Sequence, residues 1–139
     1  MPNHTILRGV DAPDFTGDAP GEFRGYGRPM GASQIALNLR VLAPHTSHNP
    51  PNVDPSSGHS HSTIEEIYLV VSGRITAKLD DEVVTLGPRD AVLMAPGGVR
   101  AYRNDSDAEA VVVMCSVKVA DPHAESSWHE GFWSDGVGA

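Results

Sequence analysis

The sequence predicts an all-β fold, a sandwich or barrel built as a single domain. A chain of 139 residues is long enough for one hydrophobic core and too short for two. Fourteen glycines and 11 prolines separate short runs rich in valine, isoleucine and leucine, which is typical of many short strands joined by turns. No long segment has the periodic apolar spacing of an amphipathic helix. We therefore expect strands throughout the middle of the chain.

Seven strands are expected within residues 34–120, which we interpret as the barrel domain. Their ranges are 34–43, 66–72, 74–79, 82–86, 91–95, 99–103 and 110–119. The breaks between them have chemical reasons. Ser72 and Gly73 form a tight turn, and Asp80 and Asp81 close a short hairpin. Two further turns, at residues 96–98 and 104–107, are rich in Pro and Gly or in Asn, Asp and Ser, which do not easily continue a strand.

The two ends of the chain differ in composition from this middle segment. Residues 1–33 mix glycine, proline and charge with scattered aromatic side chains, and we expect an N-terminal arm there. Residues 121–139 should form a C-terminal tail with one short helix, because Asp121 can cap it and Pro122 suits its first position. We expect the aromatic residues of this tail to pack on the barrel or on a neighbouring subunit.

Composition argues against several partners. Ten Lys and Arg against 18 Asp and Glu give a net charge of −8, which disfavours nucleic acid and anionic membranes. No apolar stretch approaches the roughly 20 residues needed to span a bilayer, and the N-terminus lacks the pattern of a secretory signal. The glycine-rich segment 25–31 follows no expected strand and opens no helix, so no nucleotide-binding site is expected. We expect a cytoplasmic protein.

Two histidines and a glutamate are the most informative residues. His59 and His61 are two positions apart, so on an extended chain they point the same way. Glu66 follows at the start of an apolar strand, where an unpaired carboxylate would be unfavourable. Two imidazoles and a carboxylate form the facial ligand set of non-haem Fe(II), and they also suit Mn, Zn, Ni or Cu. We expect a divalent transition metal here, with solvated loop histidines as the simpler alternative.

This spacing resembles that of the cupins, a family of small β-barrels with two sequence motifs. Four residues fit the first motif: His59, His61, Glu66 and Gly73. Gly97 and Asn104 fit the second motif. Three positions depart from the family pattern. Val53 stands in place of the opening Gly of the first motif, and Arg89 and Ala95 stand in place of the Gly and the Pro of the second. The resemblance covers about residues 34–119 and implies a jelly-roll barrel of the double-stranded β-helix type.

Arg100 stands where the second cupin motif has a histidine. The family takes its fourth metal ligand from that histidine, whereas a guanidinium stays protonated and cannot bind a metal. One outcome is that His59, His61 and Glu66 hold a metal alone while Arg100 clamps an anionic substrate. The other is that Arg100 pairs with Glu66 and the site is a metal-free binding pocket. A structural arginine that reaches solvent at the barrel rim is a third interpretation.

Three further residues are candidates for substrate binding. Tyr68 and Tyr102 share strand faces with the site residues and would line the pocket if those faces look inward. A buried tyrosine with a satisfied hydroxyl is the commoner explanation for each. Arg40 could grip an anion, and the alternative is a solvent-facing arginine. His45 and His48 lie in a Pro-rich loop, and we do not expect either to replace the missing ligand.

One face of the expected barrel needs a covering partner. The strand at 66–72 is apolar on both faces, because Ile67, Leu69 and Val71 alternate with the inward residues. A second sheet, the arm or a partner subunit could cover them, and the resemblance to cupins favours a homodimer. Cys115 alternates with valines on an apolar face, so we expect a small buried residue and not a nucleophile.

These residues predict metal-dependent chemistry on a small polar or anionic molecule, of oxygenase or isomerase type. The alternative is a non-catalytic protein that binds or senses a small molecule, with or without metal. A third possibility is a structural barrel in which a metal only stabilises the fold. The fold alone does not decide, because one barrel can host many functions.

Overall fold

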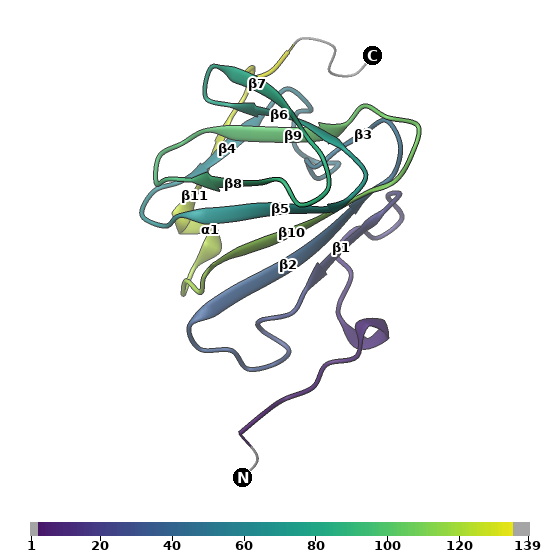
Figure 1. Ribbon diagram of the computed structural model, residues 1–139. Coiled ribbons are helices and arrows are strands. Elements are labelled where there is room, and N and C mark those ends of the chain that lie inside the picture. The colour runs from purple at the N-terminus through teal and green to yellow at the C-terminus, as the bar shows by residue number, and fades with distance from the viewer. Residues whose placement is uncertain (1–2, 135–139) are drawn as a thin grey trace.

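The fold consists of two antiparallel β-sheets packed face to face, as the computed structural model in Figure 1 shows. The structure describes residues 3–134. The outermost parts of the predicted arm and tail, residues 1–2 and 135–139, lie outside the described residues. The prediction of an all-β fold is confirmed. Within residues 3–134, no helix is long and apolar enough to cross a membrane.

The first sheet has five strands, and the second has six. In spatial order, the first sheet contains β1 (Glu22–Gly25), β2 (Ile35–Leu42), β10 (Ala110–Val117), β5 (Glu66–Ser72) and β8 (Ala91–Met94). The second contains β11 (Ser126–His129), β4 (Gly58–His61), β9 (Arg100–Asn104), β6 (Ile75–Leu79) and β7 (Glu82–Leu86), with β3 (Thr46–Ser47) also paired to β9. Two short helices complete the fold, the 3-10 helix η1 (Gly9–Asp11) and α1 (Pro122–Glu125).

All seven expected strands are present, each within two residues of its expected ends. The short helix α1 is also confirmed, because the Asp121 side chain accepts hydrogen bonds from the backbone amides of His123 and Ala124. Four short strands were not predicted, namely β1, β3, β4 and β11. These strands are two to four residues long, and their extended form depends on pairing with a neighbour rather than on their own composition.

The hydrophobic core fills the space between the sheets. Alternate residues of the long strands point into it, as the burial of Tyr68 and Val70 on β5 and of Val112 and Met114 on β10 shows. The remaining core residues are Leu42, Ile75, Ala77, Met94, Tyr102 and Ala110. The same alternation brings Glu66 and Arg100 inward, one from each sheet, so the polar site is built into the inner faces of the sandwich.

The outer face of the first sheet is apolar and exposed. One row crosses four strands of this sheet and contains Leu37, Cys115, Ile67 and Leu93, paired side by side. Ile67 is 46% exposed and Leu93 is 55% exposed, so no described element covers this row. Cys115 is exposed, which corrects the expectation that it is buried. An apolar strand face in a sequence does not reveal whether that face lies inside the fold or outside it.

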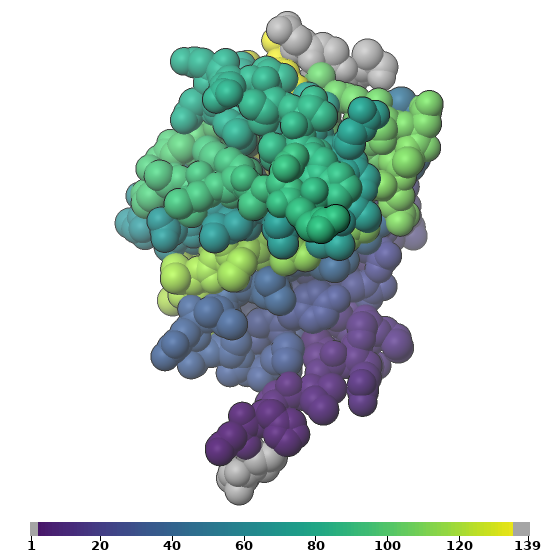
Figure 2. Space-filling view, in the orientation of Figure 1, coloured from purple at the N-terminus to yellow at the C-terminus, as the bar shows by residue number. Residues whose placement is uncertain are grey.

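The N-terminal segment runs along one end of the sandwich before it joins the first sheet. It forms β1, which pairs antiparallel with the edge of β2. Asp14 stabilises the segment that leads into β1. Its Oδ1 accepts hydrogen bonds from the amides of Thr16 and Phe23 at 3.0 and 3.1 Å. The start of the described chain, coloured purple, projects from the body of the molecule (Figure 2).

Candidate functional site

His59 and His61 are carried by β4, near the edge of the second sheet. β4 pairs with β9 on one side, where His59 lies opposite Arg100, and with β11 on the other. Both imidazoles point to the same side of the strand, and their ring centroids are 5.4 Å apart. His59 is buried, and His61 is only partly exposed.

Glu66 reaches the two histidines from the opposite sheet. It begins β5, and its Oε1 lies 3.6 Å from Nε2 of His61. One possible ligand atom from each of His59, His61 and Glu66 lies within 4.8 Å of the others. The structure thus brings together the three residues selected from the sequence, and their atoms suit a divalent transition metal.

Arg100 is the fourth member of this cluster and is almost completely buried, at 1% exposure. Its Nη2 donates a hydrogen bond to Oε1 of Glu66 at 2.9 Å. Its Nε donates to the hydroxyl of Tyr68 at 2.8 Å, and its Nη1 donates to the carbonyl of Gly98 at 3.0 Å. All three guanidinium nitrogens therefore have protein acceptors, and the side chain does not reach solvent at the rim.

The cluster holds Glu66 ionised and His59 neutral. Burial alone would raise the pKa of Glu66, but hydrogen bonds from His61, Tyr68 and Arg100 outweigh it and lower this pKa to about 2. Burial, together with the nearby charge of Arg100, lowers the pKa of His59 to about 3. A carboxylate and a neutral imidazole are the protonation states that a metal requires of its ligands.

The two imidazoles differ in their hydrogen bonds. Nδ1 of His61 lies 3.1 Å from the hydroxyl of Ser126 on β11, which leaves Nε2 directed toward Glu66. Nδ1 of His59 is buried and has no hydrogen-bond partner among the described residues. Buried ring nitrogens normally have a partner, so this unpaired atom fits a site that takes a metal. The donor set and this atom together are compatible with the metal expected from the sequence.

The helix α1 holds the loop that joins His61 to Glu66. The Glu125 carbonyl accepts a hydrogen bond from the amide of Ser62 at 2.9 Å. Its side-chain Oε1 accepts hydrogen bonds from the Thr63 hydroxyl at 2.8 Å and from the Ile64 amide at 3.1 Å. Sequence reasoning missed Glu125 and Ser126, because they lie some 60 positions from their partners and belong to no motif.

Tyr68 belongs to the cluster, whereas Tyr102 lies behind it. The Tyr68 hydroxyl lies between Arg100 and His59, 3.4 Å from Nε2 of that histidine. Tyr102 donates a hydrogen bond to the sulfur of Met114 at 3.4 Å and is fully enclosed in the core. Neither tyrosine lines the cavity next to His61 and Glu66 that is described below.

Arg40 is buried but lies apart from the cluster. It donates hydrogen bonds to Nδ1 of His48 at 3.2 Å and to the carbonyl of Glu22 at 3.0 Å. His48 is itself buried and stacks on the Tyr102 ring, with centroids 4.4 Å apart. Arg40 thus ties β1 and the Pro-rich loop to β2. It is neither solvent-facing nor in the cavity.

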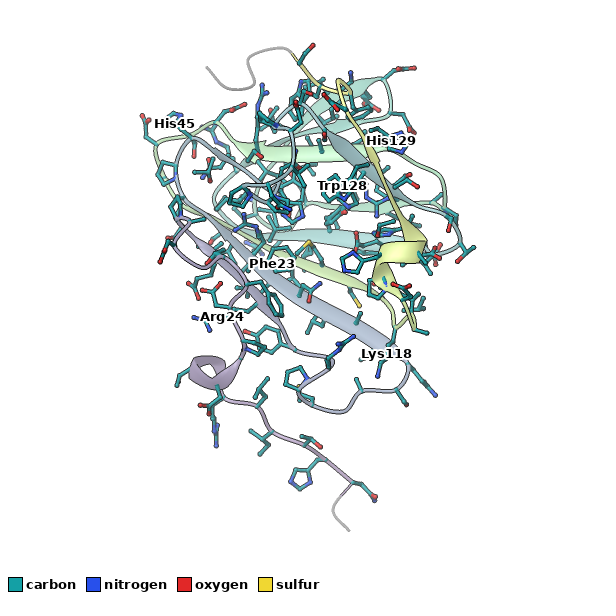
Figure 3. The ribbon with its side chains drawn as sticks, turned by 180° about the vertical axis from the view of Figure 1, so that it is seen from behind. Phe23, Arg24, His45, Lys118, Trp128 and His129 are labelled. Carbon is teal, nitrogen blue, oxygen red and sulfur yellow. The ribbon has the colours of Figure 1, made fainter. Side chains whose placement is uncertain are left out.

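A cavity of about 380 Å³ opens onto His61 and Glu66. Its walls come from residues 25–29 of the arm, the start of β2, residues 116–119 at the end of β10, and α1. Lys118 lies at the end of β10 on the side of the molecule that carries α1 (Figure 3). The volume lies within the range of small-molecule sites, so a ligand that fills this cavity would contact the cluster.

A protein-family model described as "Cupin domain" matches residues 42–117, which is more than half of the chain. The protein belongs to the cupin family. A cupin protein from Bacteroides fragilis is 21% identical with a TM-score of 0.66, covering 87% of this chain and 89% of that chain. A structure from Silicibacter pomeroyi, described as a sugar phosphate isomerase of the cupin superfamily, is 17% identical with a TM-score of 0.64, covering 84% and 78%.

A putative sugar phosphate isomerase from Acidithiobacillus ferrooxidans is 14% identical with a TM-score of 0.61, covering 91% of this chain and 86% of that chain. No curated protein matches the sequence. At these identities the structures show a shared fold, and the expected cupin barrel is confirmed. In this cupin the second motif places an arginine, Arg100, against the carboxylate of the first motif.

Proposed function

We propose that this cupin binds a divalent transition metal, one of Fe, Mn, Ni, Cu or Zn, through His59, His61 and Glu66, and acts on a small molecule in the adjoining cavity. The convergence of these three donor groups within 4.8 Å, next to a cavity of about 380 Å³, carries the proposal. When bound, such a metal supplies Lewis-acid or O₂-activating chemistry, which suits isomerase or oxygenase reactions. Two cupins of similar fold are described as sugar phosphate isomerases.

Arg100 orients Glu66 in this proposal. Its Nη2 hydrogen bond uses one carboxylate oxygen, and a carboxylate has two oxygens with about four acceptor positions. Glu66 can therefore keep Arg100 and still contribute a ligand atom. Each of the three guanidinium nitrogens already donates to a protein group inside the fold, so positioning Glu66 suits Arg100 better than clamping a substrate. The positive charge of Arg100 should lower the affinity for metal compared with a four-ligand site.

A metal-free protein that binds or senses a small molecule is the second candidate, and the buried ion pair between Arg100 and Glu66 favours it. In this case the guanidinium supplies the positive charge that balances the carboxylate. The cavity would then bind a small molecule without a metal and without catalysing a reaction.

Elemental analysis of the purified protein separates the two candidates. The parent should be compared with Glu66→Ala and with Glu65→Ala, whose target is an adjacent but exposed glutamate. Near-stoichiometric metal in the parent and in Glu65→Ala, but not in Glu66→Ala, would support the metal site. Little metal in all three after reconstitution would overturn it. If a chelator lowers the melting temperature and leaves ligand binding unchanged, the metal has only a structural role.

We also propose that two copies associate through the outer face of the first sheet. The exposed row of Leu37, Cys115, Ile67 and Leu93 carries no charged side chain. Two identical apolar faces can pack about a two-fold axis without bringing like charges together, despite the net charge of −8. A continuous apolar surface of this kind is unusual on a monomer. The cytoplasmic location stays a prediction from the sequence.

A further inference from the structure

The walls of the cavity differ in chemistry from the metal-binding end. Much of the lining consists of aromatic, aliphatic and proline residues, among them Phe15, Tyr26, Pro29, Ile64, Val119 and Pro122. They belong to the arm, the loop before β5, the end of β10 and α1. Apolar surface therefore comes from several separate segments around the cavity. Such walls favour a ligand with a hydrocarbon body.

The two carboxylates of the cavity already have protein partners. Glu66 accepts a hydrogen bond from Arg100 at 2.9 Å, and Glu125 accepts one from the Thr63 hydroxyl at 2.8 Å and another from a backbone amide. The charge of Glu66 is therefore balanced by an ion pair, while Oε1 of Glu125 is used by neutral donors of the loop that joins His61 to Glu66.

The two lining cations are less satisfied. Lys118 donates to the backbone carbonyl of Ala32 at 2.8 Å, and that acceptor carries no net charge. Arg28 is exposed at the cavity. Within residues 3–134, neither side chain forms an ion pair with a carboxylate, although the protein as a whole is acidic. Two exposed cations that line a largely apolar cavity and have no anionic partner among the described residues suit the negative end of a ligand.

We propose that the cavity binds a small carboxylate with an apolar body, whose carboxylate contacts Arg28 and Lys118 and whose other end faces His61 and Glu66. A volume of 380 Å³ corresponds to roughly a dozen water volumes, which allows a ligand of about 10 to 15 non-hydrogen atoms. A sugar phosphate fits less well, because hydroxyls that leave water would face carbon walls without new partners. The placement of the ligand's reacting end at His61 and Glu66 rests on the proposed function. Binding of the carboxylate itself is expected with or without the metal.

Isothermal titration calorimetry with matched probes tests the ligand class. The probes are benzoate, phenylacetate, 3-phenylpropionate and 4-methylpentanoate, with 3-phenylpropanamide as the uncharged counterpart and glucose 6-phosphate as the polar anion. We expect at least one carboxylate to bind with a Kd below about 1 mM. The amide should bind about tenfold more weakly than 3-phenylpropionate, and glucose 6-phosphate should bind more weakly than the best carboxylate. Failure of all four carboxylates to bind, or tighter binding of the sugar phosphate, would overturn the proposal.

Variants locate the binding site. Lys118→Gln and Arg28→Gln should each weaken carboxylate binding about three- to tenfold and leave the amide unchanged, whereas Val119→Ser should weaken both. Arg74→Gln removes an exposed arginine outside the lining and serves as the control. Equal effects of the control and the cavity variants would contradict the assignment. If the carboxylates bind to a protein that takes up no metal, the ligand class stands and the metal proposal fails. If the protein takes up metal but binds none of the carboxylates, the metal proposal stands and the ligand class fails.

Discussion

Arg100 and Glu66 form a buried ion pair, with Nη2 of the arginine 2.9 Å from Oε1 of the glutamate. One residue comes from each sheet, so the pair joins the two halves of the sandwich across the site. It places a permanent positive charge next to the imidazoles of His59 and His61, where the second cupin motif has a neutral histidine. Metal affinity and stability should both respond when either member of the pair is changed.

Arg100→His should raise the affinity for a divalent metal by at least about tenfold. The substitution removes a positive charge beside the ligands and adds an imidazole at the position of the missing ligand. Competition with a chelating dye, using Zn²⁺ or Co²⁺, measures the change. Arg74→His is the control, because it adds a histidine at an exposed position outside the cluster. An unchanged or lower affinity in a folded Arg100→His protein would contradict the proposed metal centre.

Glu66→Gln should destabilise the metal-free protein by about 3 to 5 kcal/mol, because it leaves the buried Arg100 without its charged partner. Urea unfolding measures the free energy. The double variant Glu66→Gln with Arg100→Met should recover part of the loss, since the unpaired charge is then gone. Glu65→Gln, at an exposed neighbouring position, should stay within about 0.5 kcal/mol of the parent. A loss as small as that of the control would show that the pair is not buried in solution.

Ser126→Ala should lower metal affinity about tenfold, the lower end of the effect expected when a hydrogen bond that orients a ligand is lost. The Ser126 hydroxyl lies 3.1 Å from Nδ1 of His61 and orients that ring. Ser127→Ala is the matched control, because Ser127 is exposed on the same strand. The Co²⁺ absorption spectrum should also change in Ser126→Ala, which a purely structural role would not produce. Identical metal affinities in both variants would rule out a positioning role for Ser126.

The long strands and the cluster of His59, His61 and Glu66 could be predicted because their signals are local. Alternation places His59 and His61 on one side of the chain, and the spacing to Glu66 matches a known motif. The cavity could not be predicted, because its walls come from the arm, β10 and α1, which meet only in the folded chain. The contacts of Ser126 are long-range for the same reason. Cys115 was misjudged because periodicity shows that a strand face is apolar and leaves its location open.

Acid should loosen the arm that forms part of the cavity wall. Hydrogen bonds from the amides of Phe23 and Thr16 lower the pKa of Asp14 from 3.8 to about 2. Because the folded-state pKa lies below the unfolded value, this stabilisation is complete above pH 3.8 and is lost as the pH falls toward 2. Hydrogen exchange at the Phe23 amide, corrected for its intrinsic pH dependence, should accelerate over this range. Asp14→Ala, which removes the acceptor, should show fast exchange at all pH values, and Asp18→Ala, at an exposed neighbouring position, should behave like the parent.

Ile67→Glu should convert a dimer into a monomer. Ile67 lies in the exposed row between Cys115 and Leu93, so a two-fold contact through this face would bury a glutamate from each copy in an apolar interface. Light scattering after size-exclusion chromatography gives the mass. Val83→Glu introduces the same charge at a comparably exposed valine on β7 of the other sheet and should leave the dimer intact. A parent that elutes as a monomer at micromolar concentration would refute the association, and dissociation by Val83→Glu alone would move the interface to the second sheet.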